Sequence, residues 1–161
     1  MRKLFNNSFA MLLCMAMAAV FTACEPEKEP TLSFFCDGVE ISDGSTFTST
    51  KLDEEYAAMG MTRFVPGIDL VGDTDGKVIV TVKSLNETGI EVCAFGGCQL
   101  TLPHLSYTIS ASGEMCAETP LPLEIHYTAT AEKPSAQALI TAHYEGYEDK
   151  AVSFTLVMAN E

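Results

Sequence analysis

From Thr31 onward, apolar and polar residues alternate along the chain in short runs that are separated by turn signals. A period of two, with β-branched and aromatic residues at the apolar positions, is typical of strands that bury one face. Dipeptides such as Asp37-Gly38 and Gly96-Gly97 stand between the runs and favour tight hairpins. We expect strands at residues 32–36, 39–41, 64–71, 77–85, 89–94, 98–102, 106–111, 123–129, 138–144 and 151–158. This pattern predicts an all-β domain over residues 31–161, built from two packed antiparallel sheets.

One segment departs from the period of two. Leu52, Tyr56 and Met59 are spaced as on one face of a helix. Thr50 stands where an N-cap would lie, and Gly60 stands where a C-cap would lie. We therefore expect at most one short helix, near residues 51–59.

The first residues predict export. Arg2 and Lys3 precede an uncharged apolar run of 13 residues, 9–21. A helix that spans a bilayer needs about 20 such residues, so the run fits the apolar core of a secretory signal peptide covering residues 1–23. Small residues then stand directly before Cys24, in an order that resembles the bacterial lipobox, and this resemblance implies that Cys24 receives lipid and becomes the new N-terminus. The alternative is an ordinary cleavage site followed by an incidental cysteine.

Residues 24–30 are expected to hold the lipidated cysteine and an acidic tether. The stretch after Cys24 contains two prolines and no large apolar residue, so we expect it to be extended. An acidic, lysine-containing stretch at this place resembles the surface-export signal of Bacteroidota lipoproteins. The resemblance implies an outer-membrane lipoprotein displayed on the cell surface, and a periplasm-facing position is the alternative.

The charge of the chain limits its partners. It has 22 acidic and 9 basic residues, a formal net charge of −13, and removal of Arg2 and Lys3 with the signal peptide would leave −15. An acidic domain repels nucleic-acid phosphates and anionic lipid headgroups. We therefore expect no nucleic-acid partner, and contact with the membrane only through the lipid on Cys24.

Four further cysteines would remain in an oxidising compartment, where an even number predicts disulfides. Cys93 and Cys98 flank a short glycine-containing loop that would place them opposite one another on two strands, within disulfide distance. The alternatives are a redox pair, which favours a helix start, and a metal knuckle, which needs four converging ligands. Cys36 and Cys116 would then pair by elimination, although four cysteines allow three connectivities.

The tip of the Cys93–Cys98 loop is the candidate contact with a partner. It consists of Phe95, Gly96 and Gly97 together with Ala94. A projecting Phe95 would present an aromatic ring on a braced loop, as binding surfaces do. The alternative is a ring that folds back onto the core.

Two groups of residues suggest metal chemistry but have simpler explanations. His126 and His143 are expected to face outward, and if their strands were neighbours the pair would still lack further ligands. The turn at Asp73–Gly76 resembles the start of a calcium loop, but Lys77 breaks the ligand pattern and a hairpin turn explains it. The sequence contains no nucleophile elbow or phosphate-binding glycine loop. We expect no catalytic residue, no metal and no cofactor.

Several short motifs together resemble small outer-membrane lipoproteins of Bacteroidota. The motifs are Asp37-Gly38, the Cys93–Cys98 hairpin, Gly113-Glu114, His126-Tyr127 and a final β-hairpin. Such modules are similar to immunoglobulin and fibronectin type III sandwiches, so the resemblance implies an immunoglobulin-like β-sandwich and no activity. Our first hypothesis is a non-catalytic, lipid-anchored binding or accessory module that meets a protein or glycan. The alternatives are a structural subunit of an envelope or fimbria-like assembly and, third, an enzyme.

Overall fold

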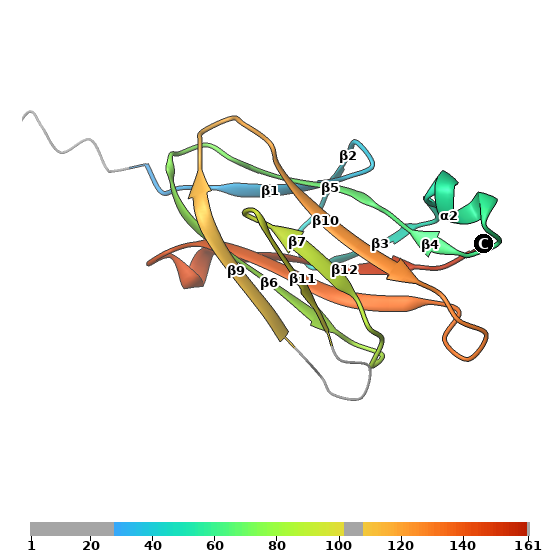
Figure 1. Cartoon of the computed structure of the whole chain (residues 1–161). Coiled ribbons are helices and arrows are strands. Elements are labelled where there is room, and N and C mark those ends of the chain that lie inside the picture. The colour runs from blue at the N-terminus through green and yellow to red at the C-terminus, as the bar shows by residue number, and fades with distance from the viewer. Residues whose placement is uncertain (1–27, 102–107, 161) are drawn as a thin grey trace, which may run out of the picture.

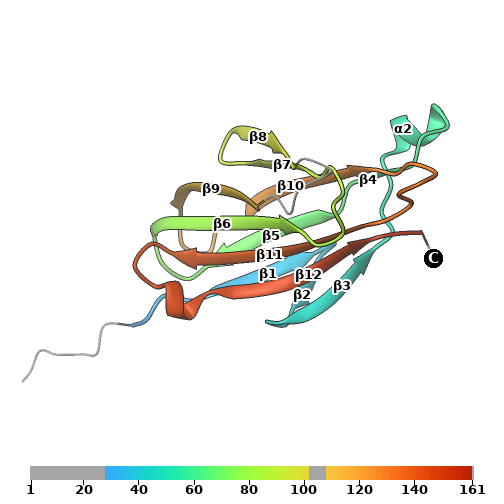
Figure 2. The same ribbon diagram turned by 90° about the horizontal axis from the view of Figure 1, so that it is seen from below.

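The computed structural model describes residues 28–101 and 108–160. The predicted signal peptide and Cys24 lie outside these described residues. Within them, two sheets pack face to face (Figures 1 and 2). The first, seven-stranded sheet contains β1 (Leu32–Cys36), β2 (Val39–Ile41), β4 (Arg63–Phe64), β5 (Gly67–Gly72), β7 (Glu91–Ala94), β8 (Gly97–Leu100) and β10 (Leu121–Thr128). The second, five-stranded sheet contains β3 (Ser45–Ser49), β6 (Gly76–Ser84), β9 (Thr108–Met115), β11 (Ala136–Tyr144) and β12 (Val152–Met158).

The order of the strands determines which edges are exposed. The first sheet runs β2-β1-β5-β10-β7-β8, with β4 beside β10, and the second runs β3-β12-β11-β6-β9. Strands β8 and β9 therefore form the two edges on one side of the sandwich, and β2 and β3 form the edges on the other side. Figure 2 shows the two layers along their edges.

The core lies between the layers, because alternate residues of each strand point inward. On β6 the inward residues are Val78, Val80 and Val82, all at most 2 % exposed. Across the layers, the ring of Phe34 on β1 meets Phe154 on β12 edge to face, with centroids 5.0 Å apart. The predicted fold class is confirmed: the domain is an immunoglobulin-like β-sandwich.

The strand β3 was missed by the sequence pattern and changes the predicted topology. It pairs with β12 in parallel, from Ser45 opposite Phe154 to Ser49 opposite Met158. The expectation of purely antiparallel sheets was therefore wrong at this edge. The reason is that Phe47 is the only large apolar residue of the strand, so its pattern resembles a polar loop.

The strand predicted over 64–71 is divided by a proline. Strands β4 and β5 pair with β10 in one common register, since Phe64 faces Tyr127 and Ile68 faces Leu123. Pro66 lies between them and has no N–H to donate to the ladder. The two pieces are thus one strand interrupted at a buried proline.

The predicted helix is present as α2 (Glu54–Ala58), but it begins later than expected. Asp53, not Thr50, is the N-cap, because its Oδ1 accepts from the N–H groups of Glu55 at 2.9 Å and Tyr56 at 3.2 Å. A single turn of 3₁₀ helix, η1 (Glu148–Lys150), joins β11 to β12. No helix among the described residues is long and apolar enough to cross a bilayer.

The last residues of the predicted tether contact the domain. Lys28 Nζ lies 2.8 Å from Asp73, and Glu29 lies 2.8 Å from Lys150 Nζ. Pro30 is buried, so the last residue of the predicted tether packs against the domain. In Figure 1 this entry point and α2 lie at opposite ends of the sandwich.

Candidate interaction surface on the seven-stranded sheet

The β7–β8 hairpin turns over two residues. Phe95 and Gly96 both have positive φ, 50° and 78°, as a type I′ turn requires. Ala94 pairs with Gly97, and Cys93 pairs with Cys98 as the next cross-strand pair. The two sulfur atoms are bonded, with Cα atoms 4.0 Å apart, so the predicted Cys93–Cys98 disulfide is confirmed.

The ring of Phe95 folds back and packs against the core instead of projecting. It lies over Gly113 of β9, in the space that a β-carbon at that position would fill. Gly96 and Gly97 remain exposed at the tip. The hairpin is therefore fixed in two ways, by a disulfide within it and by an aromatic contact with the other sheet.

Strand β8 presents an exposed edge. All four of its residues are exposed, and the side chain of Leu100 is 58 % exposed. Among the described residues β8 pairs only with β7. A depression of about 400 Å³ lies beside the hairpin and is closed on its other side by Leu121, Pro122 and Glu124 of β10. In the described residues the hairpin thus offers an unpaired edge along β8, and a shallow hollow at its tip on the side of β10.

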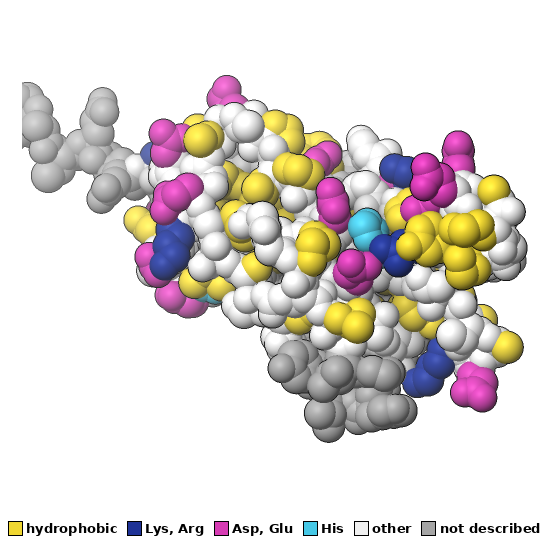
Figure 3. Space-filling view, in the orientation of Figure 1, with side chains coloured by type: hydrophobic (Ala, Val, Ile, Leu, Met, Phe, Trp, Pro, Cys, Tyr) yellow, Lys and Arg dark blue, Asp and Glu magenta, His cyan; other side chains and the backbone are white. Residues whose placement is uncertain are grey.

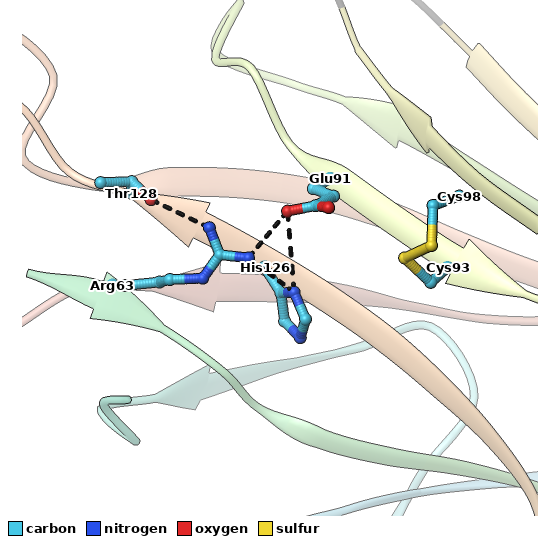
Figure 4. A network of polar contacts seen from close by, with 6 residues as sticks. All are labelled: Arg63, Glu91, Cys93, Cys98, His126 and Thr128. Atoms are coloured by element: carbon cyan, nitrogen blue, oxygen red, sulfur yellow. Dashed lines mark hydrogen bonds and ion pairs between the residues drawn. A yellow bond between two sulfur atoms is a disulfide. The ribbon is translucent and has the colours of Figure 1, made fainter. Parts of the chain in front are cut away.

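A polar network on the outer face joins three strands (Figure 4). Arg63 Nη2 donates to Glu91 Oε2 at 2.7 Å and lies 2.9 Å from His126 Nδ1, while Nη1 donates to Thr128 Oγ1 at 3.3 Å. Because a guanidinium can only donate, His126 accepts at Nδ1, which places the proton of a neutral ring on Nε2. The hydrogen bond from Arg63 lowers the pKa of the Glu91 carboxyl below its ordinary value.

The side chains of this network have a structural role, because they connect three strands. The side chain of Arg63 lies among its three acceptors and is only 16 % exposed. In the described part of the chain, His126 and His143 hydrogen-bond to Arg63 and to the carbonyl of Tyr144, and neither is paired with a hydroxyl or thiol nucleophile. The arrangement therefore ties β4, β7 and β10 together and contains no nucleophile–base pair.

The two candidate metal groups do not converge. His126 lies on β10 and His143 on β11, which belong to different sheets, so the two histidines are not neighbours. Asp73 accepts from the N–H of Thr31 at 2.8 Å, and Asp75 accepts from the N–H of Ala117 at 2.7 Å. These carboxylates fix the turn between β5 and β6. The two strands belong to different sheets, so the turn connects the layers and the expectation of a hairpin here was wrong. Within residues 28–101 and 108–160, no three His, Cys, Asp or Glu side chains are grouped to hold a metal ion.

The pairing of Cys36 with Cys116 was wrong, since both are free thiols. Cys36 ends β1, where it is fully buried, and faces Ile68. Cys116 is exposed and follows β9, close to Gly72, which faces the opposite end of β1. Four residues of strand separate the two ends by roughly 13 Å, well beyond the reach of a disulfide.

Sequence reasoning did not identify Arg63 and Glu91. The signal was present, because each residue occupies an outward position next to a buried neighbour, Phe64 and Val92. What the sequence does not reveal is that β4 and β7 both border β10 and so bring these charges together.

The comparisons with known proteins support the fold class. No protein-family model matches the sequence, and no curated protein matches it. The structure is similar to the N-terminal domain of PorA, with a TM-score of 0.51 and 12 % identity over 80 % of this chain and 96 % of that domain. Weaker likenesses link it to a FixG-related protein from Vibrio parahaemolyticus (TM-score 0.42, 12 % identity, 84 % and 99 % of the chains) and to a PapD-like domain of human CEP192 (0.36, 12 %, 86 % and 93 %). At 12 % identity, the likeness to the PorA domain shows the fold alone and no activity.

Proposed function

We propose that the chain is a non-catalytic binding or accessory module, held at the outer membrane by lipid on Cys24 and displayed on the cell surface. The signal-peptide layout and the lipobox-like residues before Cys24 support the anchor. The acidic stretch after Cys24 supports surface display. The polar network supports a non-catalytic role, because its residues connect strands and leave no activated nucleophile.

The observation that carries the proposal is the exposed edge of β8. An unpaired strand edge can accept an extended segment of another protein by main-chain hydrogen bonding, and the hollow at the hairpin tip can receive a side chain or a sugar. The disulfide and the contact of Phe95 with Gly113 hold this edge in place before binding. A surface that is already ordered loses less conformational entropy when a partner binds.

The β3 edge gives no support to the alternative of an envelope-assembly subunit. A sandwich that completes itself with a strand from a neighbour would leave an edge open for that strand. Here β3 pairs with all of Phe154 to Met158 along the outer edge of β12. This edge of the five-stranded sheet is therefore occupied by the chain itself.

Affinity capture with the mature lipoprotein in its own envelope tests the proposal. Leu100→Glu places a charge on the β8 edge, and Val39→Glu is the matched control, since Val39 is 56 % exposed on the opposite edge of the same sheet. We expect a partner that wild type and Val39→Glu retain and Leu100→Glu loses. Equal retention by all three would remove the β8 edge from the function. Mass spectrometry of the N-terminus tests the anchor, and an unmodified Cys24 would contradict it.

A further inference from the structure

A second exposed surface surrounds α2. Six large apolar side chains are exposed among the described residues, and three of them, Leu52, Met59 and Met61, lie within ten positions around this helix. The helix itself buries no residue. Figure 3 shows hydrophobic side chains gathered over α2 and β4, next to basic and histidine side chains. Such a concentration differs from the single exposed apolar residues that are common on protein surfaces. We call Leu52, Tyr56, Met59 and Met61 the α2 patch.

The α2 patch is held rigidly. The N–H of Met61 donates to the carbonyl of Tyr56 at 2.9 Å, and the N–H of Gly60 donates to the carbonyl of Ala57 at 3.0 Å. Gly60 has a positive φ of 77°. These bonds form a Schellman motif, which fixes the end of the helix. A helix of this length is unstable alone, so contacts with the sheet must hold it.

The polar network supplies one such contact. The guanidinium of Arg63 lies 4.7 Å from the ring centroid of Tyr56, and the same group is held by Glu91. The helix is thereby attached to β4 and β7. Its methionines, which adapt readily to different partners, are presented on an ordered base.

The charges around the α2 patch are acidic. Glu54 and Glu55, in the first turn of α2, are exposed and form no ion pair among the described residues. The nearby cations are already paired, since Arg63 binds Glu91 and Lys51 lies 3.7 Å from Asp37. A segment with apolar anchors beside Lys or Arg complements this surface, because its cations meet free carboxylates.

The position of the α2 patch favours a protein over the anchoring membrane. Gly72 faces Leu32 near the point where the tether enters, and Phe64, beside α2, lies eight residues further along the same interrupted strand. That distance is roughly 25 Å of strand. Figures 1 and 2 both show α2 at the end of the sandwich opposite the start of β1. A domain anchored through Cys24 therefore points this patch away from its own membrane.

We propose that the α2 patch binds a protein segment in which aliphatic or aromatic anchor residues alternate with Lys or Arg. The proposal rests on the binding role inferred above and adds a second surface with a defined partner chemistry. The apolar anchors cover Met59 and Met61, and the cations of the segment pair with Glu54 and Glu55.

The test uses the full mature lipoprotein in detergent and a short fluorescein-labelled peptide of leucine and lysine, read by fluorescence anisotropy. Two control peptides replace each leucine by serine or each lysine by glutamate. Met59→Gln/Met61→Gln removes the apolar contact. Val39→Gln/Leu85→Gln is the matched control, because both residues are similarly exposed and lie outside α2.

We expect Met59→Gln/Met61→Gln to weaken binding of the leucine–lysine peptide by about tenfold or more, as for hot-spot residues. Glu54→Gln/Glu55→Gln should weaken it several-fold and flatten its dependence on salt. The Val39→Gln/Leu85→Gln protein should bind like wild type, and neither control peptide should bind comparably. Full affinity in Met59→Gln/Met61→Gln, or equal affinity of the serine–lysine peptide, would overturn the proposal.

Evidence for either of two other binding partners at the α2 patch would also overturn the proposal. One is a second copy of the chain, shown by a dimer in sedimentation that Met59→Gln/Met61→Gln converts to a monomer. The other is lipid, shown by equal binding to zwitterionic vesicles. The capture experiment with Leu100→Glu separates this inference from the proposed function. Consider the outcome in which capture is lost in Leu100→Glu while the peptide binds Met59→Gln/Met61→Gln as well as wild type. In that case the proposed binding role stands and only this inference fails.

Discussion

The ring of Phe95 lies against Gly113, so the tip of the β7–β8 hairpin in one sheet rests on β9 of the other sheet. Any side chain at Gly113 would overlap this ring. We predict that Gly113→Ala destabilises the domain by about 1–3 kcal/mol, the usual cost of overpacking. Urea denaturation measures the change. The same substitution in a Phe95→Ala background should have a much smaller effect, and a full effect there would show that the two residues do not interact.

The Cys93–Cys98 disulfide closes a very short loop, so its entropic contribution is small. We predict that Cys93→Ala/Cys98→Ala lowers the free energy of unfolding by about 2 kcal/mol, according to the loop-closure relation. The change should also accelerate amide exchange in β8, because the hairpin loses one of its two attachments. Unchanged exchange in β8 would mean that the contact of Phe95 alone fixes the hairpin.

Four elements show which parts of the structure the sequence pattern predicts and which parts it does not. Alternation located β1 and β2 at their true bounds, because Asp37-Gly38 sets a two-residue turn between them. The same rule missed β3, whose stability comes from pairing with β12 rather than from its own apolar residues. The helical spacing of Leu52 and Tyr56 placed the start of the helix too early, with Thr50 as its N-cap, because Asp53 was not recognised as the cap.

The candidate site was predicted in part. The Cys93–Cys98 pair follows from local spacing, and the structure confirms it. The pairing of Cys36 with Cys116 failed because elimination assumes that all remaining thiols are within reach, and the register of β1 with β5 keeps these two apart. The Arg63–Glu91 contact depends on sheet order, which alternation alone does not determine.

The ion pair between Arg63 and Glu91 predicts a defined dependence on pH. The folded pKa of Glu91 lies below its ordinary value of 4.5, so its stabilisation is complete above that value and is lost as pH falls through the lowered folded pKa. The Glu91 side chain is 39 % exposed, so we expect less than about 1 kcal/mol at neutral pH. Urea denaturation of wild type and Glu91→Gln should therefore differ slightly at pH 7 and converge in acid. A difference that grows in acid would contradict this assignment.

The two free thiols should react very differently. Burial raises the pKa of the Cys36 thiol to about 12, and the side chain is inaccessible within β1. Cys116 is exposed. We predict that iodoacetamide labels Cys116 in the native protein at neutral pH and labels Cys36 only after unfolding, as measured by peptide mass spectrometry. Rapid native labelling of Cys36 would show that β1 opens readily.

The proposed binding role is tested most directly by hydrogen exchange of the protein with and without a partner identified by affinity capture. We expect slower exchange in the partner complex at the amides of Gly97–Leu100, because main-chain hydrogen bonds to the partner would form along the exposed edge of β8. Unchanged exchange in this strand, with protection elsewhere, would contradict the assignment of the β8 edge as the binding surface.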